Sequence, residues 1–444
     1  MIEITDEIIT ELLNIKQKDV ESVSSQRKNG ILYIFVTLAK APQNCPNCGC
    51  VTNKIKEYKR KEIKHSLLNQ SKCIIVYRAR RYLCECCKST FFEPSPFAKK
   101  GSNISNLTII NVLNELKEPN ATFTSVAKHN GISKTQVEII FDTYVNVPRQ
   151  TLPKVLCIDE VYTQTSKTSK YSCLLLDFTK QRLIDVIRNR HKVTLLDYFE
   201  KIPMVERKNV EYVVMDMYEI YRNVVKRRLP NAKIAVDSFH VVMNYSKAIN
   251  NIRIRIMKTY SKRSIEYYLL KTFYWLLLIG KPEENEGKWN KRLNRYINYP
   301  QLLDLILDIS DELKQAYHLK YEYLLFNRYS TYEDARQELW NHIELMDECA
   351  CDEIIQMRKT LINWSEEIIT SFICIDGKRL SNGIMESKNG IAKQIKNNAN
   401  GYLNFTRYRN RCLYVMNYDI EPNLTGNNKS VKMKGSKRGS HTKN

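Results

Sequence analysis

The sequence predicts a multidomain α/β protein, and three observations lead to this fold class. Cysteines cluster between Cys45 and Cys87, where β-forming residues are also frequent. Short apolar strands alternate with helical segments beyond the prolines Pro148 and Pro153, which is typical of a mixed sheet covered by helices. The stretch from residue 240 to about 373 is helical throughout. We therefore expect a cysteine-rich module, a mixed α/β core and a helical insertion within that core.

Length and composition restrict the class of protein. The chain has 444 residues, with 70 Lys and Arg against 48 Asp and Glu, and its formal net charge is +22. This charge indicates a polyanionic partner, with nucleic acid first and an anionic membrane surface second. No apolar run is long enough to cross a bilayer, and the acidic first residues carry no secretion signal. We expect no membrane partner and a cytoplasmic location, where the 13 cysteines are free thiols or metal ligands.

The N-terminal part contains the pattern of a four-cysteine zinc site. A helix over Asp6 to Ile15 and strands over Ile31 to Leu38 and Lys72 to Leu83 are expected around it. Two C-x2-C turns can direct four thiolates at one tetrahedral Zn²⁺ ion, which would be structural. The alternative is a set of unrelated core thiols, and Cys86 is a possible substitute in the second turn. The predicted ligands are Cys45, Cys48, Cys84 and Cys87.

A helix-turn-helix is expected between Thr122 and Val137. Gly131 supplies the positive φ of the turn, and Ser133 caps the second helix. The exposed start of that helix is where a recognition helix meets base edges, and it contains Lys134, Thr135 and Gln136. An ordinary helical hairpin without a DNA-binding role is the alternative.

Two apolar strands of the predicted core are each followed by an aspartate. Asp159 follows Val155–Ile158, and Asp216 follows Val210–Met215. Glu386 lies one turn into a later helix, which also carries Lys393 and Lys396 as candidate DNA contacts. Because carboxyl ends of strands carry the chemistry of open α/β sheets, these carboxylates can hold two Mg²⁺ ions in a ribonuclease-H-like core, with Mn²⁺ as a substitute.

These segments together resemble a family of bacterial insertion-sequence transposases, the DDE-type ISL-three family. The resemblance extends from Cys45 to about Tyr418 and depends on five segments in order. They are CPNCG at 45–49, RRYLCECCKSTFFE at 80–93, CIDEVY at 157–162, the run from 213 to 242 that contains VVMDMYEIY and VDSFHVV, and NGIMESKNGIAKQIKNNANGYLNFTRYRNR at 382–411.

The resemblance implies that Asp159, Asp216 and Glu386 are the catalytic triad. Asp237 and His240 match the D/C-x2-H element that follows the second aspartate in relatives. Asp237 also ends a short apolar strand, so it competes with Asp216 for the second catalytic position. His240 is either a helix N-terminal residue that packs or orients a neighbour, or a supporting residue near the scissile strand. Where the family has a basic residue, this chain has Asn397, Asn398 and Asn400.

The implied function is DNA transposition. Such a protein binds the terminal inverted repeats of its element, cleaves DNA and joins it to target DNA, as a dimer or larger assembly on DNA, close to the nucleoid. The alternatives are a non-enzymatic DNA-binding regulator derived from a transposase and a polyanion- or RNA-binding scaffold. The expected parts are a zinc-binding module, a helix-turn-helix domain, the first part of the catalytic core, a helical insertion, the part of the core that carries Glu386 and a basic disordered tail, over residues 1–95, 100–148, 153–240, 241–380, 381–420 and 421–444.

Overall fold

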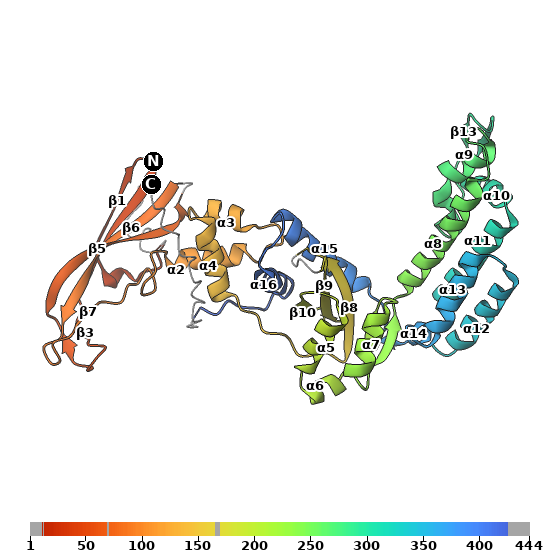
Figure 1. The fold of residues 1–444 in the computed structure, drawn as a ribbon. Coiled ribbons are helices and arrows are strands. Elements are labelled where there is room, and N and C mark those ends of the chain that lie inside the picture. The colour runs from red at the N-terminus through yellow and green to blue at the C-terminus, as the bar shows by residue number, and fades with distance from the viewer. Residues whose placement is uncertain (1–10, 12, 69–70, 165–168, 425–444) are drawn as a thin grey trace, which may run out of the picture. The chain divides into compact units, whose positions relative to one another are not determined.

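The computed structural model describes residues 11, 13–68, 71–164 and 169–424 (Figure 1). The chain forms two compact units: Met1–Pro148 with Gln394–Asn444, and Arg149–Lys393. The chain thus leaves the first unit, builds the second and returns to the first. The expected helix from Asp6 to Ile15 and the expected tail lie largely outside the described residues. No helix in the described ranges is long and apolar enough to cross a membrane.

The first unit contains a five-stranded sheet. Its strands follow the order β1-β2-β6-β5, with β7 paired to β6, and the β1–β2 turn contains Asn29 and Gly30, which both have positive φ. One face buries an apolar cluster that includes Ile34, Ile75 and Ala79. The strand bounds are β1 (Val20–Lys28), β2 (Ile31–Leu38), β5 (Ile55–Leu68), β6 (Ser71–Leu83) and β7 (Thr90–Phe92). The predicted strands therefore form, and the polar β1 and β5 accompany them.

Four α-helices lie wholly within the described part of the first unit. They are α2 (Asn106–Glu115), α3 (Phe123–His129), α4 (Lys134–Tyr144) and α16 (Phe405–Met416). Helix α16 packs on the other three, since the Tyr414 and Phe141 rings lie 6.1 Å apart and Tyr414 Oη donates to the Leu113 carbonyl. The buried Arg411 donates to the carbonyls of Glu118 and Ala121. The expectation grouped residues 381–420 with the catalytic core, whereas the structure groups the chain from Gln394 onward with the helices of the first unit.

The second unit is built on a mixed five-stranded sheet. The strand order is β10-β9-β8-β11-β12, in which β8, β11 and β12 are parallel and β9 and β10 antiparallel. Leu174, Leu175 and Leu176 on β9 are all fully buried, so both faces of the sheet are covered. The bounds are β8 (Val155–Tyr162), β9 (Tyr171–Asp177), β10 (Leu183–Ile187), β11 (Tyr212–Met215), β12 (Lys233–Val236), α5 (Lys192–Glu200), α6 (Met204–Lys208) and α7 (Glu219–Arg228).

A helical block follows β12 directly. It contains α8 (Ser238–Met257), α9 (Ile265–Thr272), η2 (Tyr274–Leu277), the hairpin β13 (Lys288–Asn290) and β14 (Arg295–Ile297), α10 (Tyr299–Leu307), α11 (Asp311–Tyr329), α12 (Ala335–Leu345), η3 (Met346–Glu348), α13 (Asp352–Asn363) and α14 (Ser365–Thr370). A short hairpin of β15 (Cys374–Ile375) and β16 (Lys378–Arg379) then leads into α15 (Gly383–Asn398). The hairpin β13–β14 was not expected inside this block.

Two arginines of α8 form hydrogen bonds and ion pairs that stabilise this block. Arg253 is buried and donates to the Leu270 carbonyl at 2.8 Å. Arg255 forms ion pairs with Glu312 and Glu353.

Candidate functional site

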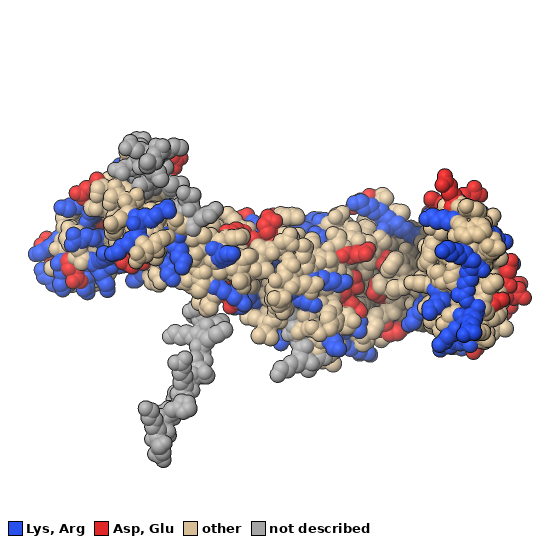
Figure 2. Space-filling model, turned by 90° about the horizontal axis from the view of Figure 1, so that it is seen from above, with Lys and Arg blue, Asp and Glu red and all other residues tan. Residues whose placement is uncertain are grey.

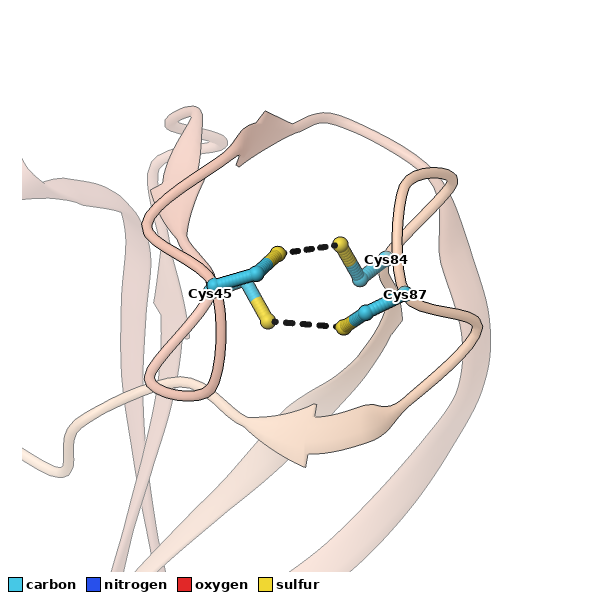
Figure 3. Close-up of side chains that lie close together, drawn as sticks. Cys45, Cys84 and Cys87 are labelled. Carbon is cyan, nitrogen blue, oxygen red and sulfur yellow. Dashed lines mark hydrogen bonds between the residues drawn. The ribbon is translucent and has the colours of Figure 1, made fainter.

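The four predicted zinc ligands lie together in the first unit. Two loops bring their thiols face to face, as Figure 3 shows for the three labelled side chains. The Sγ atoms of Cys45 and Cys87 are 3.6 Å apart, and those of Cys48 and Cys84 are 3.4 Å apart. A tetrahedral site with Zn–S bonds of about 2.3 Å requires S–S separations of about 3.8 Å, so the four thiols fit one Zn²⁺ ion.

Ser89 supports this cluster and was not predicted. Its hydroxyl lies 2.9 Å from Cys87 Sγ and 3.3 Å from Cys45 Sγ. The Ser89 hydroxyl lowers the pKa of Cys45, and together with the Ser89 N–H and the Asn47 side chain it lowers the pKa of Cys87 to about 5. Thiolate formation is therefore favoured at Cys45 and Cys87, whereas burial and the neighbouring thiols raise the pKa values of Cys48 and Cys84. The only signal in the sequence was the position of this serine, two residues after the ligand Cys87.

The second helix of the predicted helix-turn-helix begins as its sequence indicates. Gly131 has φ +66°, and a Cβ atom there would lie 2.7 Å from Leu67 Cδ2, so the turn requires glycine. Ser133 Oγ accepts from the Gln136 N–H, while Gln136 Oε1 accepts from the Ser133 N–H. Lys134 and Thr135 are exposed at the helix start. The Gln136 side chain is half-buried and engaged in this capping box, which the sequence argument did not foresee.

Three aspartates converge at the carboxyl ends of the parallel strands. Val214 pairs with Cys157 and Met215 with Val236, and continuing both registers puts Asp159, Asp216 and Asp237 at one level. The Asp237 N–H confirms this alignment by donating to the Met215 carbonyl. Asp159 lies within β8 rather than at its end, because β8 continues to Tyr162 as the partner of β9. The sequence placed this strand end too early.

His240 lies between two of these carboxylates. It is in the first turn of α8, and its Nε2 is 2.7 Å from Asp216 Oδ1 and 3.9 Å from Asp237 Oδ2. Burial alone would lower the pKa of His240, but the Asp216 carboxylate outweighs this effect and raises it. The imidazole therefore contacts Asp216 directly, which favours an orienting role over simple packing. Asp216, Asp237 and His240 can together offer ligand atoms to one metal ion.

Helix α15 and the residue directly before it place two asparagines at the same site. Asn389 Nδ2 donates to Asp159 Oδ2 at 2.6 Å. The Asn382 backbone N–H contacts Asp237 Oδ1 at 3.4 Å, and its Nδ2 donates to the Ile158 carbonyl. Glu386 lies one helical turn before Asn389 and is exposed, without a hydrogen bond or ion pair to the described residues. The asparagines were not predicted, and their only signal was their position around Glu386.

The carboxylate cluster suits a cation. Burial, with a contribution from Asp216, raises the pKa of Asp159 to about 6, and burial also raises the pKa of Asp237. Oδ1 of both Asn382 and Asn389 is buried and accepts no hydrogen bond among the described residues, while Asp216 Oδ1 faces His240 Nε2. Oxygen atoms left in this way beside crowded carboxylates are the donor set that Mg²⁺ prefers. The residues therefore fit a divalent ion.

The two predicted lysines of α15 fall on either side of the division between the units. Lys393 is exposed and ends the second unit, whereas Lys396 is half-buried in the first. A DNA contact is therefore more accessible at Lys393.

Comparison with known proteins identifies the family. The transposase profile of the ISL3 family matches residues 156–412, which is more than half of the chain. The chain belongs to the ISL3 family of transposases. Two further profiles match this ISL3 transposase, the zinc finger of transposases IS204/IS1001/IS1096/IS1165 at residues 41–87 and the helix-turn-helix domain of the ISL3 family at residues 93–145.

A relative of this ISL3 transposase is the transposase for insertion sequence element IS1001 from Bordetella parapertussis. The two are 22% identical over 363 residues, which cover 81% of this chain and 85% of the relative. The zinc finger, the DNA-binding helix-turn-helix and the transposase domain thus occur in the expected order. The four-cysteine cluster supports structural zinc in the first of them.

Proposed function

We propose that this ISL3 transposase cleaves DNA at the ends of its element and joins the freed 3′-hydroxyl to target DNA. The catalytic carboxylates would be Asp159, Asp216 and Glu386 on a ribonuclease-H-like core. The observation that carries the proposal is the common level of Asp159, within β8, with Asp216 and Asp237, directly after the parallel strands β11 and β12. The order of those strands, with two antiparallel strands beside them, supports the proposed core fold.

Each neighbour of the carboxylates has a definable task. Two Mg²⁺ ions, replaceable by Mn²⁺, would be held by the three catalytic carboxylates and would activate the attacking oxygen and stabilise the leaving oxygen. Asn389 holds the Asp159 carboxylate through its 2.6 Å hydrogen bond, and His240 fixes Asp216. Because both steps are in-line phosphoryl substitutions, orientation and charge are what the protein must supply. Asp237 remains the alternative second ligand.

DNA recognition would reside in the first unit. The zinc finger and the helix-turn-helix would bind the inverted repeats, with Lys134 and Thr135 at the exposed helix start. The Oε1 atom of Gln136 is engaged in the helix cap. Gln136 would therefore contact a base either through its Nε2 group or after this cap has opened. Lys393 and Lys396 would contact backbone phosphates. Two element ends must be paired, so the active assembly would contain at least two copies of the chain.

Metal-dependent nicking of end-containing DNA separates this function from a non-enzymatic regulator. The wild-type chain should nick the DNA at the repeat boundary with Mg²⁺ or Mn²⁺ but not with Ca²⁺. Glu386→Gln should lose at least three orders of magnitude in rate and still bind the repeats. Specific repeat binding by the wild type without any nicking in Mg²⁺ or Mn²⁺ would favour the regulator.

A further inference from the structure

The hairpin β13–β14 displays two large aromatic rings that the helical block does not cover. Trp289 and Tyr296 pair across the two strands, with ring centroids 5.2 Å apart, and they are 49% and 71% exposed. Trp364 of the same block is buried in its apolar core, whereas Trp289 is not.

The same hairpin forms one wall of a cavity. The cavity has a volume of about 460 Å³, within the range of about 300–1,000 Å³ typical of ligand sites. Its lining is largely aromatic, and the Trp275 and Tyr299 rings meet edge to face at 5.0 Å within it. The aromatic lining residues are Tyr268, Phe273, Trp275, Trp289 and Tyr299.

Hydrogen bonds hold this wall in place. Asn290 Oδ1 accepts from the N–H groups of Arg292 and Leu293, which fixes the hairpin turn. The Arg292 guanidinium donates to the Arg263 and Ser264 carbonyls and lies over the Tyr268 ring at 4.8 Å. These bonds tie the hairpin to the start of α9 and fix this wall of the cavity.

Basic side chains lie on the hairpin side of the cavity. Lys288 and Lys291 line the cavity, and Arg295 extends the basic side of the hairpin. All three are exposed and form no ion pair within the described ranges. The acidic residues Glu283, Glu284 and Glu286 precede the hairpin and are not part of the lining. Figure 2 shows a band of Lys and Arg side chains over this helical end of the chain, with acidic side chains at its margin.

We propose that this cavity accepts an unpaired nucleobase of a DNA strand. Trp289 would stack on the base, while Lys288 and Lys291 would contact the adjoining phosphates. Aromatic faces with neighbouring cations are the chemistry of single-strand binding, and a base within a duplex cannot enter a pocket unless it leaves the stack. The inference rests on the proposed cleavage function, since processing of element ends is what exposes unpaired bases to this protein.

Binding of the full-length chain to two DNA duplexes tests the site. One duplex is flush, and the other has the same sequence with a three-nucleotide single-stranded 3′ extension; Mg²⁺ is omitted so that no strand is cut. The wild type should prefer the extended duplex. Trp289→Ala should reduce the ratio of the two affinities about tenfold, and Trp289→Phe should keep most of the preference. Trp340→Ala is the matched control because Trp340 is also exposed but lies outside the lining.

The proposal is wrong if Trp289→Ala keeps the full preference of the wild type, or if the wild type has none. It is also wrong if Trp289→Ala changes only the association of copies in sedimentation, which would make this face a protein contact. Failure of the cleavage proposal is distinguishable, because binding is measured without cutting. If the wild type prefers the extended duplex but never nicks DNA in Mg²⁺, the result supports the base site and contradicts the proposed cleavage function.

Discussion

Asp159 combines a proposed catalytic role with an unfavourable environment. Its carboxylate is largely enclosed by the sheet, close to Asp216, and burial raises its pKa to about 6. In the metal-free protein at neutral pH, Asp159 must therefore ionise against the cost of desolvation. Asn389 offsets part of that cost with a hydrogen bond. Function and stability conflict at this residue.

Asp159→Asn should therefore stabilise the metal-free protein while abolishing cleavage. Because the folded-state pKa lies above the unfolded one, the contribution of Asp159 to stability is present below about pH 4 and is lost as the pH rises through about 6. At pH 7.5 the variant should be more stable by about 1–3 kcal/mol, measured by urea unfolding with chelator present. The difference should shrink at pH 4.5. A variant less stable than the wild type at pH 7.5 would contradict the assignment.

Three aspartates and four cysteines that the sequence singled out lie together in the structure, whereas Glu386 makes no hydrogen bond or ion pair with the described residues. Carboxylates after apolar strands identified Asp159, Asp216 and Asp237, and paired C-x2-C turns identified the four thiols. The roles of Asn389 and Ser89 were not predicted, because a single amide or hydroxyl group has no characteristic spacing in the sequence. Their contacts join segments far apart in sequence, such as Asn389 and Asp159, and only the folded structure brings these together.

At the scale of elements, the two cysteine loops should depend on metal for their order. Each chain should contain one Zn²⁺, and its removal should unfold the loops around β3 (Gln43–Asn44) and β4 (Val51–Thr52) while the second unit stays intact. Ser89→Ala should lower the affinity for Zn²⁺ about 10–100-fold, measured by competition with a chelator, because it removes the hydroxyl that contacts two of the ligands.

Cys86→Ser is the control for this zinc measurement. Cys86 is exposed and is not one of the four clustered thiols, so its loss should leave the zinc content at one ion per chain. Protein purified without chelator that contains no zinc would overturn the assignment.

The helical block should lose stability in acid through His342 on α12. Burial lowers the pKa of His342 to about 4, and its Nε2 lies 2.5 Å from Tyr245 Oη. A depressed histidine pKa contributes stability above the unfolded value of about 6.5, and this stability is lost as the pH falls toward 4. Thermal unfolding from pH 7 to 5 should therefore show a smaller decline in His342→Phe than in the wild type. Equal declines would show that His342 does not titrate in this range.

Elements with apolar periodicity were predictable, and elements stabilised by their context were not. The strands of the second unit are buried on both faces and appear in the sequence as continuous apolar runs. Strand β5 is rich in Lys and Arg and is exposed on one edge of its sheet, so its alternation was hidden. The hairpin β13–β14 has strands of three residues, too short for any period to be recognised.

For the whole molecule, chain order explains how the candidate site is assembled. The sheet supplies Asp159, Asp216 and Asp237, and the helical block is inserted between β12 and α15. The chain returns through α15, whose Asn389 contacts Asp159 on the sheet and whose Glu386 is exposed, before continuing into the first unit. The order of these parts was predictable from the sequence. The association of α16 with the first unit was not, because it depends on contacts such as that between Arg407 and Asp142 across most of the chain.

Cleavage by amide variants of the three aspartates tests the central proposal most directly. Nicking of end-containing DNA in Mg²⁺ and binding to the repeats should be measured side by side for Asp159→Asn, Asp216→Asn and Asp237→Asn. Asp159→Asn and Asp216→Asn should each lose nearly all nicking, because residues that form one metal site are not additive, while repeat binding survives. Asp237→Asn should lose less. Full nicking by Asp216→Asn together with an inactive Asp237→Asn would contradict the proposed site and move the second catalytic carboxylate to β12.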